Sequence, residues 1–175
     1  MNKKIILLAV IIVLTSINLF ALGLTTHVPE VLLENLEPGA TYTLFNQTGI
    51  KLDINNTGSK PADLGMEIQI PSKGSAKPGF EPLPDASWIK IEKNIFDRVP
   101  SGAKIESDVT IVVPNSPLIE GKKYQFYVWT HTMPKPGVVG VGVGLNIRFL
   151  ITIKNREVSK PNVIPQKPKK KNPKK

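Results

Sequence analysis

Apolar and polar residues alternate with a period of two in a series of short runs that begins near Thr41. The apolar members of these runs are Ile50, Leu52, Ile54, Met66, Ile68, Ile70, Ile89, Ile91, Ile105, Val109, Ile111, Val113, Tyr124, Phe126, Val128, Leu145, Ile147, Phe149, Ile151 and Ile153. Such alternation is typical of strands with one buried face. It predicts six or seven half-buried strands, and no window after the N-terminal segment predicts a helix.

Turn-forming residues separate these runs. Residues 71–84 contain too many prolines for a central strand, and we expect them to form a long exposed connection. Short strands of this kind in about 130 residues predict an all-β fold, a two-sheet antiparallel sandwich that spans residues 24–156. The chain contains no cysteine. The sandwich must therefore rely on its hydrophobic core rather than on disulfides.

The first 23 residues read as a signal peptide. Two lysines precede an apolar run at 5–14, and Ala21 and Gly23 supply the small residues of a cleavage site. This pattern predicts a signal-peptide helix at 1–23 and a working protein that begins near Leu24, either secreted or periplasmic or at the cell surface. The alternative is a membrane-anchored protein with an uncleaved N-terminal helix, because a spanning helix needs about 20 residues.

The positive charge of the chain is concentrated near its C-terminus. The formal net charge is +9, and eight of the positive charges belong to Lys3, Lys4 and six late lysines. The six are Lys167, Lys169, Lys170, Lys171, Lys174 and Lys175. Residues 157–175 are rich in lysine and proline, so we expect a disordered basic tail. These lysines are candidate contacts to an anionic wall or membrane polymer. No nucleic acid is expected, because no aromatic residues lie between them.

The order of the motifs resembles a known family. The segments LEPGATYTL, KLDINNTGSKPADLGMEIQI, WIKIEKNIFDRVPSGAKIESDVTIVVP, GKKYQFYVWTH and VGLNIRFLITI follow one another between Leu36 and Lys154. Together they resemble bacterial extracytoplasmic immunoglobulin-like domains. These are similar to the N-terminal domain of WxL-interacting surface proteins and, more distantly, to the pilus-chaperone and major sperm protein folds. The resemblance implies an immunoglobulin-like sandwich without a catalytic signature. This chain departs from both groups in lacking their second domain.

Few residues of the chain are suited to catalysis or metal binding. Its two histidines are His27 and His131. His131 could serve as a base with one of several aspartates, Asp53 among them, as its orienting partner, but no Gly-x-Ser-x-Gly motif is present. Two distant histidines without cysteine do not make a zinc site. We therefore expect no catalytic residues, no metal, no cofactor and no small-molecule substrate.

Residues 53–58 match the front half of a calcium-binding loop. Oxygen-bearing side chains occupy its first, third and fifth positions and glycine its sixth. The twelfth position, which needs a glutamate, is Leu64. We favour a strand end followed by an Asx turn, with Gly58 at a positive φ.

An uncharged run of glycine and valine covers residues 137–144. The spacing is not that of a phosphate loop, and a strand rather than a helix follows it. We expect a hairpin or a bulged strand entry here. An exposed edge of this composition could also accept a strand from a partner. The residues of this candidate partner edge are Gly137, Val139, Val141 and Val143. Nearby, Tyr127 and Trp129 lie opposite the apolar face of their run, so one of the two aromatic faces must meet solvent or a partner.

These features favour an exported, non-enzymatic cell-envelope module that binds or supports other molecules through sheet edges and a basic tail. The expected partners are an envelope protein or an anionic wall or membrane polymer. The alternative is a periplasmic chaperone-like assembly factor for surface subunits, which lends a strand to its partner. A small hydrolase is the third possibility, and it is disfavoured because no nucleophile, base and orienting group can be assembled.

Overall fold

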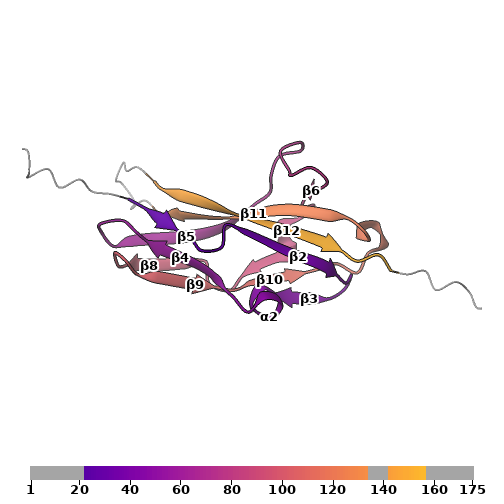
Figure 1. Ribbon diagram of the computed structural model, residues 1–175, viewed down its shortest axis with the longest axis horizontal. Coiled ribbons are helices and arrows are strands. Elements are labelled where there is room, and N and C mark those ends of the chain that lie inside the picture. Colours follow the sequence, from indigo (N-terminus) through magenta and orange to yellow (C-terminus); the bar gives the residue numbers. More distant parts are fainter. Residues whose placement is uncertain (1–21, 134–141, 157–175) are drawn as a thin grey trace, which may run out of the picture.

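The computed structural model describes residues 22–133 and 142–156, and within them the chain is built mainly of strands (Figure 1). The strands are β1 (Leu24–Thr25), β2 (Glu30–Leu36), β3 (Thr41–Thr43), β4 (Leu52–Asn56), β5 (Ala62–Gln69), β6 (Glu81–Pro82), β7 (Ile89–Ile91), β8 (Ile95–Val99), β9 (Lys104–Ser107), β10 (Val109–Val112), β11 (Lys123–Thr132) and β12 (Gly144–Ile153). The helices are α2 (Leu44–Thr48) and two 3-10 turns, η1 (Ala86–Trp88) and η2 (Pro117–Ile119). No helix of these residues is long and apolar enough to cross a membrane.

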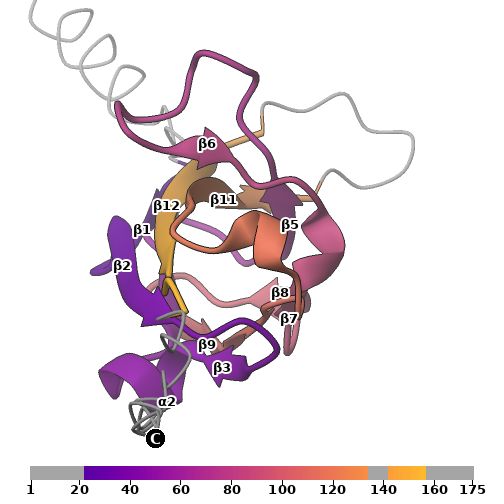
Figure 2. The same cartoon turned by 90° about the vertical axis from the view of Figure 1, so that its right-hand side faces the viewer.

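The strands form two layers (Figure 2). One layer is a six-stranded sheet in the order β2-β12-β11-β5-β8, with β6 beside β11. The other layer consists of two three-stranded sheets, β1-β4-β9 and β3-β10-β7. The fold is therefore the all-β, immunoglobulin-like two-layer sandwich that the sequence predicts. It differs from the prediction in one respect, because β2 and β6 run parallel to their neighbours and the large sheet is mixed.

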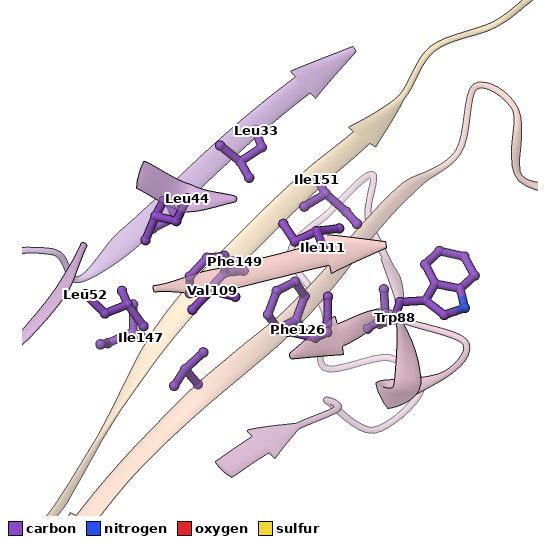
Figure 3. Packing of buried hydrophobic residues seen from close by; sticks show 14 of the residues in the cluster. Leu33, Leu44, Leu52, Trp88, Val109, Ile111, Phe126, Ile147, Phe149 and Ile151 are labelled. Atoms are coloured by element: carbon purple, nitrogen blue, oxygen red, sulfur yellow. The ribbon is translucent and has the colours of Figure 1, made fainter. Parts of the chain in front are cut away.

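The core lies between the layers and is made by the inward faces of the alternating runs (Figure 3). Phe126 of β11 stacks on Phe149 of β12, with ring centroids 4.7 Å apart. Ile111 of β10 faces them from the other layer and is fully buried. Trp88 closes one end through an edge contact with Tyr124 at 5.5 Å. Burial of such large side chains is the main stabilising term for a chain without disulfides.

The run from Ile105 to Val113 is not one strand. It divides at Asp108 into β9 and β10, which belong to different sheets. The Asp108 carboxylate accepts hydrogen bonds from the backbone amides of Phe45, at 3.0 Å, and Val109, at 2.8 Å. These bonds hold the chain at the corner where it leaves one sheet for the other.

Three other local predictions were wrong. The chain forms the short helix α2, whose first turn is capped by the Thr43 hydroxyl accepting from the Asn46 amide at 3.2 Å. Ile50 and Ile70 are exposed because they lie beyond the ends of β4 and β5. The strand β2 was missed. A fourth prediction, the exposed connection at 71–84, is right only for residues 71–80, because Glu81 and Pro82 pair with β11 as β6 and Leu83 is buried.

Candidate binding edge

The N-terminal segment passes from one layer of the sandwich to the other. The strand β1 pairs with β4. In contrast, β2 pairs in parallel with β12 (Figure 1). We call residues 26–29, which join these two strands, the crossover. Because the crossover leaves the large sheet, β2 covers β12 only from Arg148 onward. Among the described residues, no strand pairs with residues 144–147 on that side. We call residues 144–147 of β12 the open edge.

The pairing of β2 with β12 ends at a proline. The Arg148 amide donates to the Pro29 carbonyl at 3.1 Å. In a parallel ladder the amide of residue 29 would next donate to the carbonyl of Asn146, but proline has no N–H. Backbone groups of alternate residues point to the same side of a strand. The main-chain N–H and C=O groups of Arg148 point toward β2. Those of Asn146 and Gly144, two and four residues earlier, therefore point to the same side, which is the open edge.

The open edge carries no charge, unlike the longer edges elsewhere in the described sandwich. The outer strand β2 carries Glu30 and Glu34, and β8 carries Asp97 and Arg98. Charged side chains on edge strands are a common protection against unwanted pairing. The other uncharged edge strands, β1 and β3, span only two and three residues. The open edge is therefore the part of the described sheets best suited to pair with another chain.

Apolar side chains border the open edge on its inner face. Leu145 of β12 is partly buried and packs against the core, as do Leu24 of β1 and Val28 of the crossover. Next to them, Ile147 is fully buried. The inward side chains of an added strand would continue this apolar border.

The outer face of the same region carries an aromatic pair. Trp129 and His131 of β11 stack with ring centroids 3.9 Å apart and planes 14° apart. In the pairing of β11 with β12, Trp129 lies opposite Asn146 and His131 lies opposite Gly144. The alternation of β11 thus places Phe126 and Val128 in the core and Tyr127 and Trp129 on the outside, as the sequence predicts for two opposite aromatic faces.

Only one of the four residues predicted as the partner edge is described. Val143 hydrogen-bonds with Thr132 of β11, which donates its amide to the Val143 carbonyl at 2.9 Å. Its main-chain groups thus face β11, not the open side. Gly137, Val139 and Val141 lie outside the described residues, and so do the six late lysines. Gly144 ends the run that the sequence indicated, but Asn146 was not singled out, because the extent of the open edge depends on where β2 stops.

The two residues considered as a catalytic base and its orienting partner, His131 and Asp53, do not contact each other. Asp53 does not pair with His131 but accepts from Nδ1 of His27, with 2.5 Å between Nδ1 and Oδ2. The His27 amide and the Thr26 hydroxyl bond the same carboxylate. Burial raises the pKa of Asp53, but the hydrogen bonds from His27 outweigh it and leave the pKa below its usual value. His131 instead stacks on Trp129, and its Nε2 lies 3.8 Å from Glu67.

The groove beside His27 has a volume of about 410 Å³ and contains no serine or cysteine that could act as a nucleophile. It is lined by His27, Val28, Phe45, Gly49, Ile50, Lys51, Asp53, Lys104 and Glu106. Within residues 22–133 and 142–156, no three metal-ligating side chains gather into a site.

The segment that resembled a calcium loop is a strand end and a turn. The Asn56 side chain accepts from the Gly58 amide at 3.0 Å, which is the expected Asx turn. The same side chain donates to the carbonyls of Lys60 and Val99, both at 2.9 Å. Gly58 does not have a positive φ, contrary to the prediction. These oxygens serve the turn between β4 and β5.

Comparisons with known proteins returned structural neighbours only. No protein-family model matches the chain, and no curated protein matches it in sequence. The PapD-like domain 7 of human CEP192 is similar at 12% identity and a TM-score of 0.48, over 77% of this chain and 87% of that one. The periplasmic chaperone SfaE is similar at 12% identity and a TM-score of 0.48, over 79% of this chain and 61% of the chaperone. The E. coli chaperone DraB is similar at 15% identity and a TM-score of 0.46, over 77% of this chain and 56% of the chaperone. The chain thus spans less than two thirds of either chaperone. None of these neighbours is a WxL-interacting protein.

Proposed function

We propose that this chain is a non-enzymatic, extracytoplasmic binding module that takes up an extended segment of a protein partner as an added strand at the open edge. This role is closer to the chaperone-like alternative than to a purely structural module. One observation carries the proposal: the main-chain groups of Gly144 and Asn146 are directed away from β11 and have no partner strand among the described residues. An extended peptide satisfies such groups by main-chain hydrogen bonds.

The surroundings of the open edge support a peptide rather than a small molecule. A strand added there would place every second side chain against the apolar border formed by Leu24, Val28 and Leu145. Its remaining side chains would lie on the outer face beside Asn146. This arrangement offers affinity through the backbone and selectivity through alternate side chains.

Two parts of the proposal rest on the sequence alone. Export is supported by the signal-peptide pattern of residues 1–23. Contact between the late lysines and an anionic polymer is a separate proposal, supported by their charge and spacing. Neither is needed for strand addition at the open edge.

The experiment uses an acetylated and amidated nonapeptide that alternates valine with threonine, SVTVTVTVS, titrated into the full chain. Asn146→Pro removes an N–H that points out from the open edge. Leu32→Pro is the matched control, because it removes an outward N–H from the free side of β2 in the same sheet, where Leu32 is 50% exposed. We expect peptide affinity to fall at least tenfold in Asn146→Pro and to stay unchanged in Leu32→Pro, with both variants folded by circular dichroism.

Equal loss in the two variants, or no loss in Asn146→Pro, would overturn the proposal. If Asn146→Pro does not fold, the same comparison is made by N-methylation of alternate residues of the peptide. Alternate N–H groups of an added strand point toward β12 or away from it. N-methylation of the set that points toward β12 should abolish binding, and N-methylation of the other set should leave binding intact.

A further inference from the structure

The indole of Trp129 extends from β11 across the neighbouring strand β12. A Cβ atom added at Gly144 would lie only 2.6 Å from Nε1 of Trp129, closer than any side chain permits. Gly144 therefore leaves the space that the indole occupies. Because Gly144 belongs to the open edge, the N–H end of the indole lies above the strand beside which a partner would pair.

A second aromatic ring and a second glycine hold the indole in place. His131 covers one face of Trp129 by stacking at 3.9 Å. A Cβ atom added at Gly65 of β5 would lie 3.0 Å from Cε1 of His131, so a larger residue here would push the imidazole from its place. The two rings thus lie across three strands, with Gly65 on one side and Gly144 on the other. This packing fixes which end of the indole reaches the open edge.

The Nε1–H group of Trp129 is a hydrogen-bond donor that no acceptor among the described residues satisfies. Its neighbour on the outer face is Asn146, which is exposed and lies directly opposite Trp129 in the pairing of β11 with β12. The open edge therefore presents two uncharged hydrogen-bonding groups side by side on its outer face.

We propose that Trp129 and Asn146 select the outward side chains of the added strand, and that they fit a neutral acceptor such as the hydroxyl of serine or threonine or the amide of asparagine or glutamine. This inference rests on the proposed function. A carboxylate fits less well, because Glu67 lies directly opposite Trp129 on the same outer face and Arg148 is already paired with Glu30 at 2.8 Å. The partner segment then alternates apolar residues inward with neutral polar residues outward.

The test compares three peptides with identical valine positions: SVTVTVTVS, SVAVAVAVS and SVEVEVEVS. They are titrated into the ¹⁵N-labelled full chain, and the indole signal of Trp129 is assigned from its loss in Trp129→Phe. We expect all peptides that bind to shift the amides of Gly144 and Asn146, and only the threonine peptide to shift the indole Nε1–H. The threonine peptide should bind at least fivefold more tightly than the other two.

Trp129→Phe keeps the aromatic packing and removes the donor, so it should erase most of the preference for threonine without abolishing peptide binding. Equal affinities for the three peptides in the wild type, with the amides shifting and the indole unmoved, would overturn the inference while leaving the proposed function intact. Absence of amide shifts at Gly144 and Asn146 with every peptide would instead overturn the proposed function.

Discussion

His27 and Asp53 join the crossover to the opposite sheet, with Nδ1 and Oδ2 only 2.5 Å apart. Asp53 is buried in β4, whereas the His27 side chain is 76% exposed. The carboxylate also bonds the His27 amide and the Thr26 hydroxyl. This contact, together with the pairing of β1 with β4, keeps the N-terminal segment from pairing with residues 144–147 of β12.

Asp53→Asn should therefore destabilise the fold. Hydrogen bonds to a charged group contribute about 1.5–3 kcal/mol, so we expect a loss of about 1–3 kcal/mol at pH 7, measured by urea unfolding. Because the folded-state pKa of Asp53 is lowered, its stabilisation is present above the ordinary pKa of about 3.9 and disappears as the pH falls through the folded-state pKa. The wild-type and variant stabilities should converge below about pH 4. Asp97→Asn, at an exposed position of β8, should leave the stability at pH 7 nearly unchanged, and a pH-independent difference for Asp53→Asn would contradict this explanation.

The core makes a simpler prediction. Phe149 and Ile111 are fully buried on facing layers, so truncation of either to alanine should cost about 2–5 kcal/mol in the free energy of unfolding. Val112→Ala, one residue away on the outward face of β10 and 46% exposed, is the matched control and should cost well under 1 kcal/mol. Similar losses in all three variants would mean that the inward and outward faces of β10 are assigned wrongly.

Pro29→Ala tests whether the missing N–H of Pro29 ends the pairing of β2 with β12 and so leaves the open edge unpaired. The new N–H can donate to the carbonyl of Asn146 and extend the ladder of β2 by one bond. We expect the amide of residue 29 to be protected from hydrogen exchange and the affinity for SVTVTVTVS to fall severalfold. Pro117→Ala, at the start of η2, is the control for loss of a proline elsewhere. Unchanged peptide affinity despite a protected amide at residue 29 would show that β2 does not limit access to the open edge.

The sequence predicts the sandwich because most strands bury one face completely. The alternation in β11 and β12 is nearly perfect, and their inward residues Phe126, Val128, Ile147 and Phe149 are all fully buried. The strand β2 was not predicted, because its alternation of apolar and polar residues is interrupted. Leu32 is half exposed, and Asn35 has a positive φ of 58° beside a register shift, so Leu36 returns to the core out of phase. Hydrophobic periodicity cannot anticipate such a bulge.

The binding edge could be predicted only in part. The glycine and valine composition of residues 137–144 indicated the segment that leads into β12, but composition does not show which main-chain groups remain unpaired. That depends on the parallel pairing of β2 and on the place where Pro29 ends it. The contact of His27 with Asp53 was also missed, because the two residues lie 26 positions apart in the sequence and no motif links them.

The late lysines, which lie outside the described residues, make an independent prediction. Removal of residues 167–175 should leave the unfolding midpoint unchanged and abolish most attachment to vesicles that contain an anionic lipid. Attachment of the full chain should also weaken steeply as salt rises, because the Debye length shrinks from about 10 Å at 0.1 M to about 3 Å at 1 M. Cosedimentation measures both effects. If vesicle attachment survives both the deletion and high salt, the sandwich rather than the late lysines makes the contact.

Hydrogen exchange of individual amides, measured with and without SVTVTVTVS, tests strand addition at the open edge most directly. If the peptide pairs there, the amides of Gly144 and Asn146 become protected, because both point out from β12. The amides of Glu30 and Leu32, which point out from the free side of β2 in the same sheet, remain unchanged. Protection at Glu30 and Leu32 instead, or binding without protection at Gly144 and Asn146, would contradict the proposal that this protein takes its partner as an added strand beside β12.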